Sequence, residues 1–309
     1  MGYIVNQYKK NFIKRFDIEE APPELTVAVF PGLHRDEGSF VNSAGVGIRY
    51  YTYYYEGYIG DKLILFCHGL GAGHGWYMTQ IELLCRKGYH VLAPDFTGCG
   101  TSGGEKLSSV NAPARDAMEL IGKLNPREQI VLVGHSLGGY TALTVSNLLP
   151  NVRKTVIISG FISISDEMMG FVKLRLLADQ VKRFEMKLDP KMASVDNHSY
   201  LASTADKLLW IHSEDDPVVN YKYNAGWIKK HNNPNVRLIT ITGKGHFPMF
   251  TSEAIGNMNS WMAEYNGLIK EDKLKTHDEK IGFFRERTMA RMTDPEPEVF
   301  DEIDRFIRS

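Results

Sequence analysis

The chain has 309 residues, of which 43% are hydrophobic and 24% charged, an ordinary composition for a soluble globular protein that can bury a sizeable core. Its formal net charge is −1, which gives no electrostatic reason to expect binding to nucleic acid or to an anionic membrane. The three cysteines, Cys67, Cys85 and Cys99, have neither the spacing of a disulfide framework nor that of a metal site. We therefore expect no metal, no other cofactor and no nucleic-acid partner.

The N-terminal segment lacks the features of a targeting signal. It has no apolar stretch followed by a small-residue cleavage site, and Asn6 stands where a myristoylation motif needs Ser or Thr. No apolar run approaches the length of a membrane span. The sequence thus predicts a cytoplasmic protein without a membrane span.

From about residue 46 the sequence alternates between short apolar runs and amphipathic stretches of helical length. The apolar runs, dense in Ile, Leu and Val, predict strands that are buried on both faces. Strands are expected at 48–55, 62–67, 90–94, 129–134, 154–159, 207–212 and 236–242. Helices are expected at 76–87, 112–124, 138–149 and 222–231. This alternation predicts a single α/β domain with a mostly parallel central sheet flanked by helices.

A segment from about residue 160 to residue 204 interrupts the alternation. Ser165 or Asp166 can cap a helix there, and apolar residues follow at steps of three and four, as on one face of an amphipathic helix. These apolar residues are Met168, Phe171, Leu174, Leu177, Val181 and Phe184. We expect this insertion to form a small helical cap over the sheet.

The tail, about 269–309, predicts a charged helical C-terminal extension. Asp294 and Pro295 can start its last helix, which carries apolar residues along one face. These residues are Val299, Phe300, Ile303, Phe306 and Ile307. Such a face has to be buried, and packing against its own domain is favoured over the alternative, a homodimer interface.

The candidate nucleophile is Ser136, in the sequence Gly-His-Ser-Leu-Gly at 134–138. This pattern follows a predicted strand and precedes a predicted helix, which is the context of a nucleophile elbow. The turn is so tight that side chains at Gly134 and Gly138 would collide with neighbouring backbone. The strained serine is lifted above the sheet at the positive end of the following helix.

Hydrolysis through a tetrahedral oxyanion needs preorganised N–H donors. One is expected from the backbone of Leu137, the residue after the nucleophile, and the other from Leu70 in the sequence His-Gly-Leu-Gly at 68–71. We expect His68 to hold the backbone of this loop rather than to transfer a proton.

Three acids follow the predicted strand at 207–212, and one of them should orient the catalytic base. Asp216 is favoured because it stands at the turn just before the chain re-enters the fold. Asp215 is the alternative, and Glu214 is expected to face solvent.

The candidate base is His246, which lies between glycine and phenylalanine just past the predicted strand at 236–242. The other histidines after residue 216 are His231, in a polar loop, and His277, in the charged tail. The predicted catalytic residues are therefore Ser136, Asp216 and His246, in the chain order serine, acid, histidine. The acid would fix the histidine tautomer and stabilise the imidazolium.

Several motifs together resemble the α/β-hydrolase superfamily, and look most like its small-capped carboxylesterases and monoacylglycerol-lipase-like members. They are HGLG at 68–71, PDFTGCGTSGG at 94–104, GHSLGG at 134–139, HSEDDPVV at 212–219 and GKGHF at 243–247. The resemblance covers about residues 40–266 and implies the α/β-hydrolase fold with the serine triad. A serine at the elbow argues against dehalogenases and epoxide hydrolases, which resemble this family but carry an aspartate there.

The cap bears most directly on the choice of substrate. Phe161, Met168, Met169 and Phe171 can line an apolar acyl pocket, although the same residues can simply pack the cap on the sheet. We therefore expect a serine hydrolase that cleaves a carboxylic ester of small or medium acyl chain through an acyl-enzyme.

Other reactions remain compatible with the same residues. An aminopeptidase, amidase or thioesterase is the main alternative, and Asp166, Glu167 and Asp179 are the cap acids that could bind a free amine. A non-catalytic, partner-binding member of the superfamily is a third interpretation.

Overall fold

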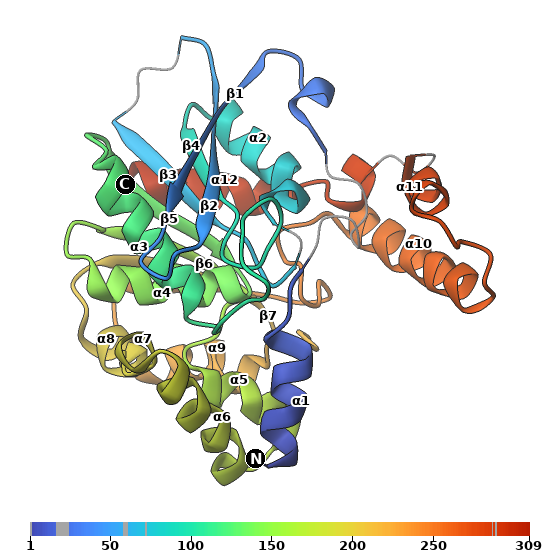
Figure 1. Cartoon of the computed structure of the whole chain (residues 1–309). Coiled ribbons are helices and arrows are strands. Elements are labelled where there is room, and N and C mark those ends of the chain that lie inside the picture. Colours follow the sequence, from blue (N-terminus) through green and yellow to red (C-terminus); the bar gives the residue numbers. More distant parts are fainter. Residues whose placement is uncertain (1, 17–24, 58–60, 72, 286, 288) are drawn as a thin grey trace.

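A mixed sheet forms the centre of the computed structural model, which describes residues 2–16, 25–57, 61–71, 73–285, 287 and 289–309. Within these residues the sheet has eight strands in the order β1-β2-β4-β3-β5-β6-β7-β8 (Figure 1). β2 pairs antiparallel with both β1 and β4, and every other pair is parallel. The strands are β1 (Leu33–Val41), β2 (Gly47–Tyr55), β3 (Lys62–Cys67), β4 (His90–Pro94), β5 (Gln129–His135), β6 (Lys154–Ile158), β7 (Lys207–Ser213) and β8 (Val236–Ile241). The expected mostly parallel α/β sheet is confirmed.

The strands predicted from apolar runs differ from the observed ones by no more than a residue at either end. β1 was not predicted, because its sequence LHRDEGSFV is exposed at most positions and lacks an apolar run. It lies at the edge of the sheet, where one neighbour is enough to pair its backbone. Pairing, rather than the pattern of its side chains, therefore makes this segment a strand.

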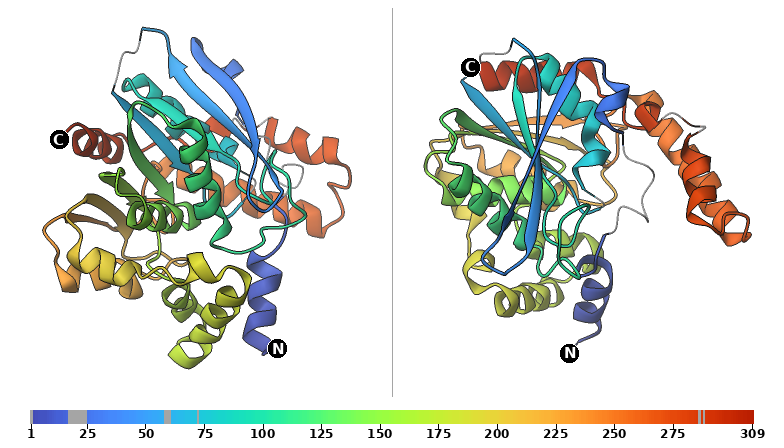
Figure 2. Two further views of the ribbon diagram at one scale, coloured as in Figure 1. Left: turned by 60° about the vertical axis from the view of Figure 1, so that its left-hand side comes forward. Right: turned by 45° about the horizontal axis from the view of Figure 1, so that its top comes forward.

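Helices cover both faces of the sheet (Figure 2). Residues of α2 and α12 pack on one face, and residues of α3, α4, α8 and α9 pack on the other. The helices in the first part of the chain are α1 (Tyr3–Phe12), η2 (Val27–Val29), η3 (His74–Tyr77), α2 (Met78–Arg86), α3 (Ala112–Leu124) and α4 (Leu137–Leu148). After the cap follow η4 (Tyr221–Tyr223) and α9 (Ala225–His231). None of the helices in the described ranges is long and apolar enough to cross a membrane.

The cap inserted after β6 differs from the single amphipathic helix that the sequence suggested. It contains α5 (Ile164–Val172), α6 (Arg175–Leu188), α7 (Pro190–Ala193) and α8 (Asn197–Ser203). Ser163, and neither Ser165 nor Asp166, caps α5, since its side chain accepts a hydrogen bond from the Asp166 N–H. The helix then ends at Lys173, whose φ of 52° places it in the left-handed region.

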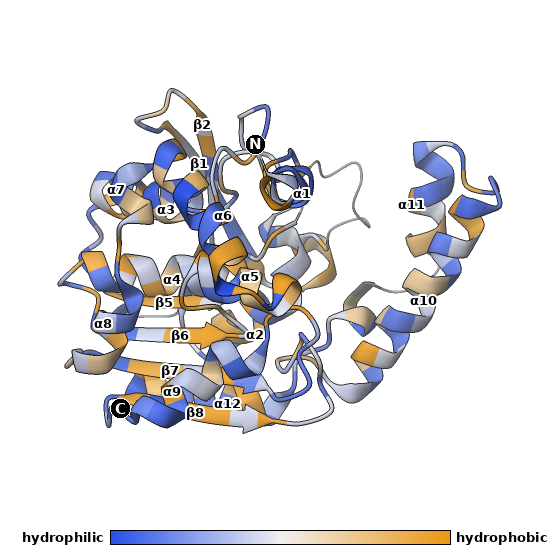
Figure 3. Ribbon diagram, turned by 90° about the horizontal axis from the view of Figure 1, so that it is seen from below, coloured by the Kyte–Doolittle hydropathy of each residue, from blue (hydrophilic) through white to orange (hydrophobic). Residues whose placement is uncertain are grey.

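The C-terminal part leaves the domain and returns to it. α10 (Ser252–Lys270) and α11 (His277–Arg285) project from the body of the molecule (Figure 3), and η5 (Met289–Met292) follows them. The excursion begins and ends at one antiparallel bridge between Phe250 and Pro295. The predicted start of the extension at about residue 269 therefore falls in the last turn of α10.

The final helix, α12 (Pro297–Arg308), starts after the Asp294–Pro295 pair that was expected to begin it, with Glu296 at its N-cap. Its apolar face is buried against the same domain, in one cluster with residues of α2 and of the sheet. The packing favoured by the sequence is confirmed, while a homodimer through this extension stays a prediction.

Candidate active site

Ser136 lies on the turn between β5 and α4 in a backbone conformation that an L-residue rarely adopts, with φ 56° and ψ −120°. The glycines around it have no room for a side chain. A Cβ on Gly134 would lie 2.1 Å from the carbonyl oxygen of Gly138, and one on Gly138 would lie 1.9 Å from that of Cys67. This crowding accounts for the glycine spacing seen in the sequence.

The two predicted oxyanion residues lie next to this turn. Leu137 is the first residue of α4, where N–H groups have no acceptor inside the helix. The loop of Leu70 approaches from β3, and a Cβ on the preceding Gly69 would lie only 3.4 Å from the Cβ of Ser136. Leu70 and Leu137 also pack in one apolar cluster.

His68 holds this loop in place, as expected. Its Nε2 accepts the N–H of Phe96 at 3.1 Å, so its Nδ1 carries the proton and donates to the Gly69 carbonyl at 2.7 Å. Burial lowers the pKa of His68, which favours this neutral form. Both ring nitrogens are thus used for structure.

Asp216 and His246 are brought together at the carboxyl ends of β7 and β8. His246 Nδ1 lies 2.9 Å from Asp216 Oδ2 and 3.1 Å from Oδ1. The backbone N–H groups of Val218 and Val219 donate to Oδ1 at 2.8 and 2.9 Å. Burial alone would raise the pKa of Asp216, but the hydrogen bonds to His212 and His246 outweigh it and hold this pKa well below its usual range. Asp216 is therefore a carboxylate that fixes the imidazole with its Nδ1 proton inward.

The alternative acids serve other purposes. Asp215 accepts the backbone N–H groups of Gly243 and Gly245 at 2.9 and 3.1 Å, so it shapes the loop that carries His246. Glu214 is exposed, as the sequence suggested.

His212 is a second imidazole on Asp216 that sequence reasoning missed. Trp210 Nε1 donates to His212 Nδ1 at 3.2 Å, which leaves the proton on Nε2. This Nε2 donates to the Val219 carbonyl at 2.9 Å and lies 3.4 Å from Asp216 Oδ2. The spacing of four residues between His212 and Asp216, across a turn, was the available signal.

A chain of hydrogen bonds joins the oxyanion loop to the loop of the base, and it was also missed. The Gly69 N–H donates to Tyr77 Oη at 3.0 Å, and Tyr77 Oη lies 3.0 Å from His135 Nδ1. His135 Nε2 lies 2.9 Å from the His246 carbonyl, to which only an N–H can donate. The Tyr77 hydroxyl therefore donates to Nδ1. Burial lowers the pKa of His135 to about 3, so this neutral tautomer persists at moderately acidic pH.

These hydrogen bonds connect the turn that carries Ser136 to the loop that carries His246. His135 precedes the serine directly, and its ring centroid lies 4.7 Å from that of His246. Among the described residues the Ser136 hydroxyl makes no hydrogen bond to the His246 ring. Such contacts often tighten only when substrate is bound.

The residues suggested for an acyl pocket divide into two groups. Phe161 and Met168 are buried, and Met169 is partly buried, in the same apolar cluster as Leu70 and Leu137. Phe171 lies outside this cluster and is 54% exposed on the cap.

A second Asp–His pair lies at the end of β4. His74 Nδ1 donates to Asp95 Oδ1 at 2.8 Å, and the opposite nitrogen, Nε2, lies 2.8 Å from the hydroxyl of Tyr53. Thr101 donates to Asp95 Oδ2 from both its N–H and its hydroxyl. All hydrogen-bonding atoms of this His74 ring are thus occupied.

No group of three or more His, Cys, Asp or Glu side chains that could hold a metal ion occurs in the ranges that the structure describes. The three cysteines are free and buried. Burial raises the pKa of Cys67, Cys85 and Cys99, which disfavours reactive thiolates.

Comparison with known proteins gives one family match and several partial relatives. The family model described as serine aminopeptidase, S33 matches residues 60–209. Human "Protein ABHD8" is 32% identical over 104 residues, which is 32% of this chain and 24% of that protein. "Probable esterase PIR7A" of Oryza sativa subsp. indica is 28% identical over 114 residues, 36% of this chain and 43% of that protein. The chain thus spans less than half the length of these curated relatives.

Solved structures share the fold at low sequence identity. The Pyrococcus furiosus esterase Pf2001 has a TM-score of 0.58 at 19% identity, covering 84% of this chain and 95% of that one. Est1E from Butyrivibrio proteoclasticus, solved with bound ferulic acid, has a TM-score of 0.55 at 14% identity, covering 68% and 91%. The match over residues 60–209 and the shared fold therefore make this chain similar to hydrolases of the α/β-hydrolase superfamily, whose fold it has.

Proposed function

We propose that this protein is a serine hydrolase that cleaves carboxylic esters of small or medium acyl chain through an acyl-enzyme. The observation that carries the proposal is the pairing of the buried Asp216 carboxylate with His246 Nδ1 at 2.9 Å, on the loop tied to the elbow of Ser136. This pairing leaves His246 Nε2 as the acceptor for the serine proton.

The mechanism follows from these positions. Ser136 Oγ attacks the ester carbonyl carbon while His246 Nε2 takes its proton, and the N–H groups of Leu70 and Leu137 stabilise the oxyanion. Collapse of this intermediate breaks the bond to the alcohol oxygen, which receives the proton from His246. Water then attacks the acyl carbon while His246 Nε2 takes its proton. Collapse of this second intermediate breaks the bond to Ser136 Oγ, which receives the proton, and the acid is released.

The cap acids favour an ester over a substrate with a free amine. Asp166 is already paired with Arg175 at 3.0 Å, and Asp179 accepts the Ser165 hydroxyl at 2.8 Å. Glu167 has one buried carboxyl oxygen without a partner in the described part of the chain. Burial, together with the nearby Asp216, raises the pKa of Glu167 well above its usual range, so the uncharged acid is a weak counter-ion for an ammonium group.

A fluorophosphonate probe and a graded series of p-nitrophenyl esters test the proposal, with Ser136→Ala as the matched control. We expect labelling of the wild type and a chain-length optimum among the esters. Both should be lost in Ser136→Ala, whose turnover should fall by roughly 10⁵-fold or more.

The other outcomes distinguish the alternatives. Labelling without ester turnover would favour a peptidase, amidase or thioesterase, and aminoacyl p-nitroanilides and acyl thioesters would then be the substrates to test. Neither labelling nor turnover would favour a non-catalytic, partner-binding protein.

A further inference from the structure

The N-terminal helix α1 lies outside the matched family region, residues 60–209, yet it packs against the cap. Figures 1 and 2 show α1 beside α6 in every view. The Tyr8 ring meets Phe184 of α6 edge-on with centroids 6.2 Å apart, and Lys9 Nζ lies 4.7 Å from the same Phe184 ring. α1 is therefore an added layer on the cap rather than a loose terminus.

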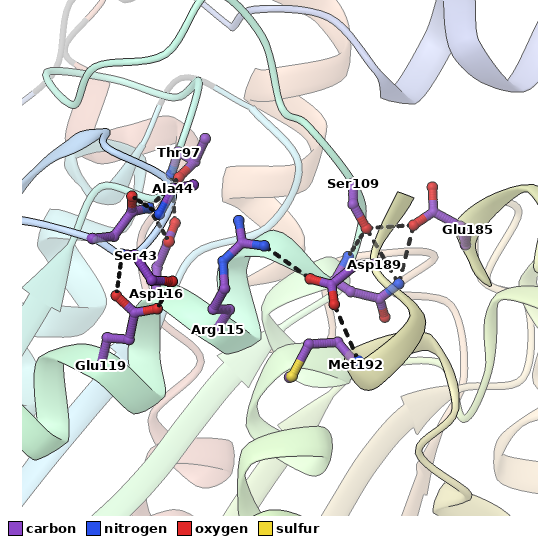
Figure 4. Close-up of polar contacts among 12 residues, drawn as sticks. Ser43, Ala44, Thr97, Ser109, Arg115, Asp116, Glu119, Glu185, Asp189 and Met192 are labelled. Carbon is purple, nitrogen blue, oxygen red and sulfur yellow. Dashed lines mark hydrogen bonds and ion pairs between the residues drawn. The ribbon is translucent and has the colours of Figure 1, made fainter. Parts of the chain in front are cut away.

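A buried carboxyl group fixes this packing. Glu185 of α6 is 0% exposed and accepts the Tyr8 hydroxyl on Oε1 at 2.6 Å. Its other oxygen, Oε2, accepts the Ser109 hydroxyl and the Asn111 side-chain N–H, the latter at 3.0 Å. Figure 4 shows Ser109 pointing at the Glu185 carboxyl group. Burial raises the pKa of both Tyr8 and Glu185, which favours the uncharged form of each side chain.

The same network reaches the helix that follows the nucleophile. Asn111 Oδ1 accepts the hydroxyl of Tyr140 at 2.6 Å. Tyr140 lies one turn after Leu137 on α4, and its ring stacks on Phe161 of the cap with centroids 4.6 Å apart. Four hydrogen bonds thus link α1, the cap, the loop before α3 and the first turn of α4.

Apolar contacts place α1 in the same cluster as the candidate acyl residues. Val5 and Tyr8 are buried with Met168 of the cap and with Leu137 beside the nucleophile. This cluster is therefore closed by three segments that are distant in sequence.

The segment after α1 is anchored at its other end. The Phe16 N–H donates to the Gly98 carbonyl at 2.9 Å, and the Gly100 N–H donates to the Phe16 carbonyl at 3.2 Å. Arg15 donates to the carbonyl of Gly104 at 2.7 Å. The hydrogen bond of Tyr8 to Glu185 and those of Phe16 to Gly98 and Gly100 therefore fix the position of α1.

We propose that α1 is a wall of the acyl site and that Tyr8 is a specificity-determining residue, which limits the length of the acyl chain that the enzyme accepts. The inference rests on the proposed ester hydrolysis. It assigns to α1 a role that the catalytic residues do not supply, because Tyr8 is buried in the apolar cluster that also holds Leu137, the residue after the nucleophile, and Met168 of the cap.

The experiment measures kcat/KM for p-nitrophenyl esters from two to twelve acyl carbons with the full chain. Tyr8→Ala removes the ring that closes the acyl site. We expect the ratio of kcat/KM for the ten-carbon ester to kcat/KM for the two-carbon ester to rise roughly 10-fold or more, since one methylene in an apolar pocket changes selectivity by about 10–200-fold. Tyr8→Phe keeps the ring but removes its hydroxyl, so the ratio should rise less.

Tyr3→Ala is the matched control, because it removes the same ring from the same helix at a position that is 74% exposed. It should leave the ratio unchanged. If Tyr8→Ala does not fold, Tyr8→Leu, which shortens the side chain but keeps an apolar contact, takes its place with the same expected direction.

A fall by one common factor for all esters would overturn the inference, because α1 would then only brace the fold. In that case the wild type still turns over esters, so the proposed function stands. A wild type that neither reacts with the probe nor cleaves any ester would overturn both.

Discussion

Two Asp–His pairs at the carboxyl edge of the sheet, His74–Asp95 and His246–Asp216, share the same contact at Nδ1 but differ at the opposite ring nitrogen. In each, the histidine Nδ1 lies within 3 Å of a buried carboxylate, at 2.8 Å for His74–Asp95 and 2.9 Å for His246–Asp216. Burial would raise the pKa of both aspartates, but electrostatic attraction and hydrogen bonding to His74 at Asp95, and hydrogen bonds to His212 and His246 at Asp216, outweigh it and lower both pKa values. Both pairs therefore hold a carboxylate against an imidazole.

The difference lies at the opposite ring nitrogen. His74 Nε2 is occupied by the Tyr53 hydroxyl, whereas His246 Nε2 has no hydrogen-bond partner among the described residues. A closed pair can only join segments of the fold, while an open pair can accept a proton from a nucleophile. An Asp–His contact by itself therefore does not identify a catalytic site.

The largest expected effect separates the two pairs by kinetics. In Asp216→Asn the amide no longer stabilises an imidazolium at His246, so kcat should fall by roughly 10⁴-fold at unchanged fold. Asp95→Asn is the matched substitution at the closed pair. It should lower kcat far less, and comparable losses in kcat per folded molecule would contradict the distinction.

Low pH should destabilise the fold through His135, whose Nε2 donates to the His246 carbonyl. Burial lowers the pKa of His135 to about 3. Because the unfolded chain then binds more protons than the folded one, the free energy of unfolding should fall as pH drops from about 6.5 towards 3, by at most about 4 kcal/mol from this group. Urea titrations between pH 4 and pH 8 measure the slope. His135→Gln should flatten it, and an identical slope in the variant would remove His135 as its source.

Removing the closed histidine should cost stability more than removing the open one. His74→Ala deletes both the donor to Asp95 and the partner of Tyr53, and leaves a buried carboxylate less satisfied, at a cost of about 3 kcal/mol in unfolding free energy. His246→Ala should cost at most about 1 kcal/mol, since Asp216 keeps the N–H groups of Val218 and Val219. Equal costs in urea unfolding would count against the comparison.

The smallest expected effect concerns the hydrogen bonds that run from Gly69 through Tyr77 and His135 to the loop of His246. Tyr77→Phe removes the hydroxyl that accepts the Gly69 N–H and donates to His135 Nδ1. We expect kcat to fall by about 10-fold with little change in KM, because the substitution loosens the oxyanion loop but touches no substrate. A raised KM at unchanged kcat would point to a role in binding instead.

Local pattern was sufficient to predict the sheet and the elbow. Apolar runs such as that of β5 have to be buried on both faces, and the glycines at 134 and 138 are dictated by contacts under 2.2 Å. These constraints act between residues that are close in sequence or on neighbouring strands, so they can be recognised from the local sequence pattern.

Tertiary structure decided what depends on groups far apart in the chain. Asp215 and Asp216 are adjacent and chemically identical, and only the turn after β7 directs one carboxylate to His246 and the other to the backbone of Gly243. The edge strand β1 needed its partner β2 to be recognised.

The docking of α1 shows the same limit most clearly. Nothing near Tyr8 in sequence indicates that it meets Glu185, because the two residues are 177 positions apart. The sequence by itself determined the fold class and the candidate nucleophile through local sterics and hydrophobic period. The partners of buried polar groups were decided only by folding, since they are chosen by position in space.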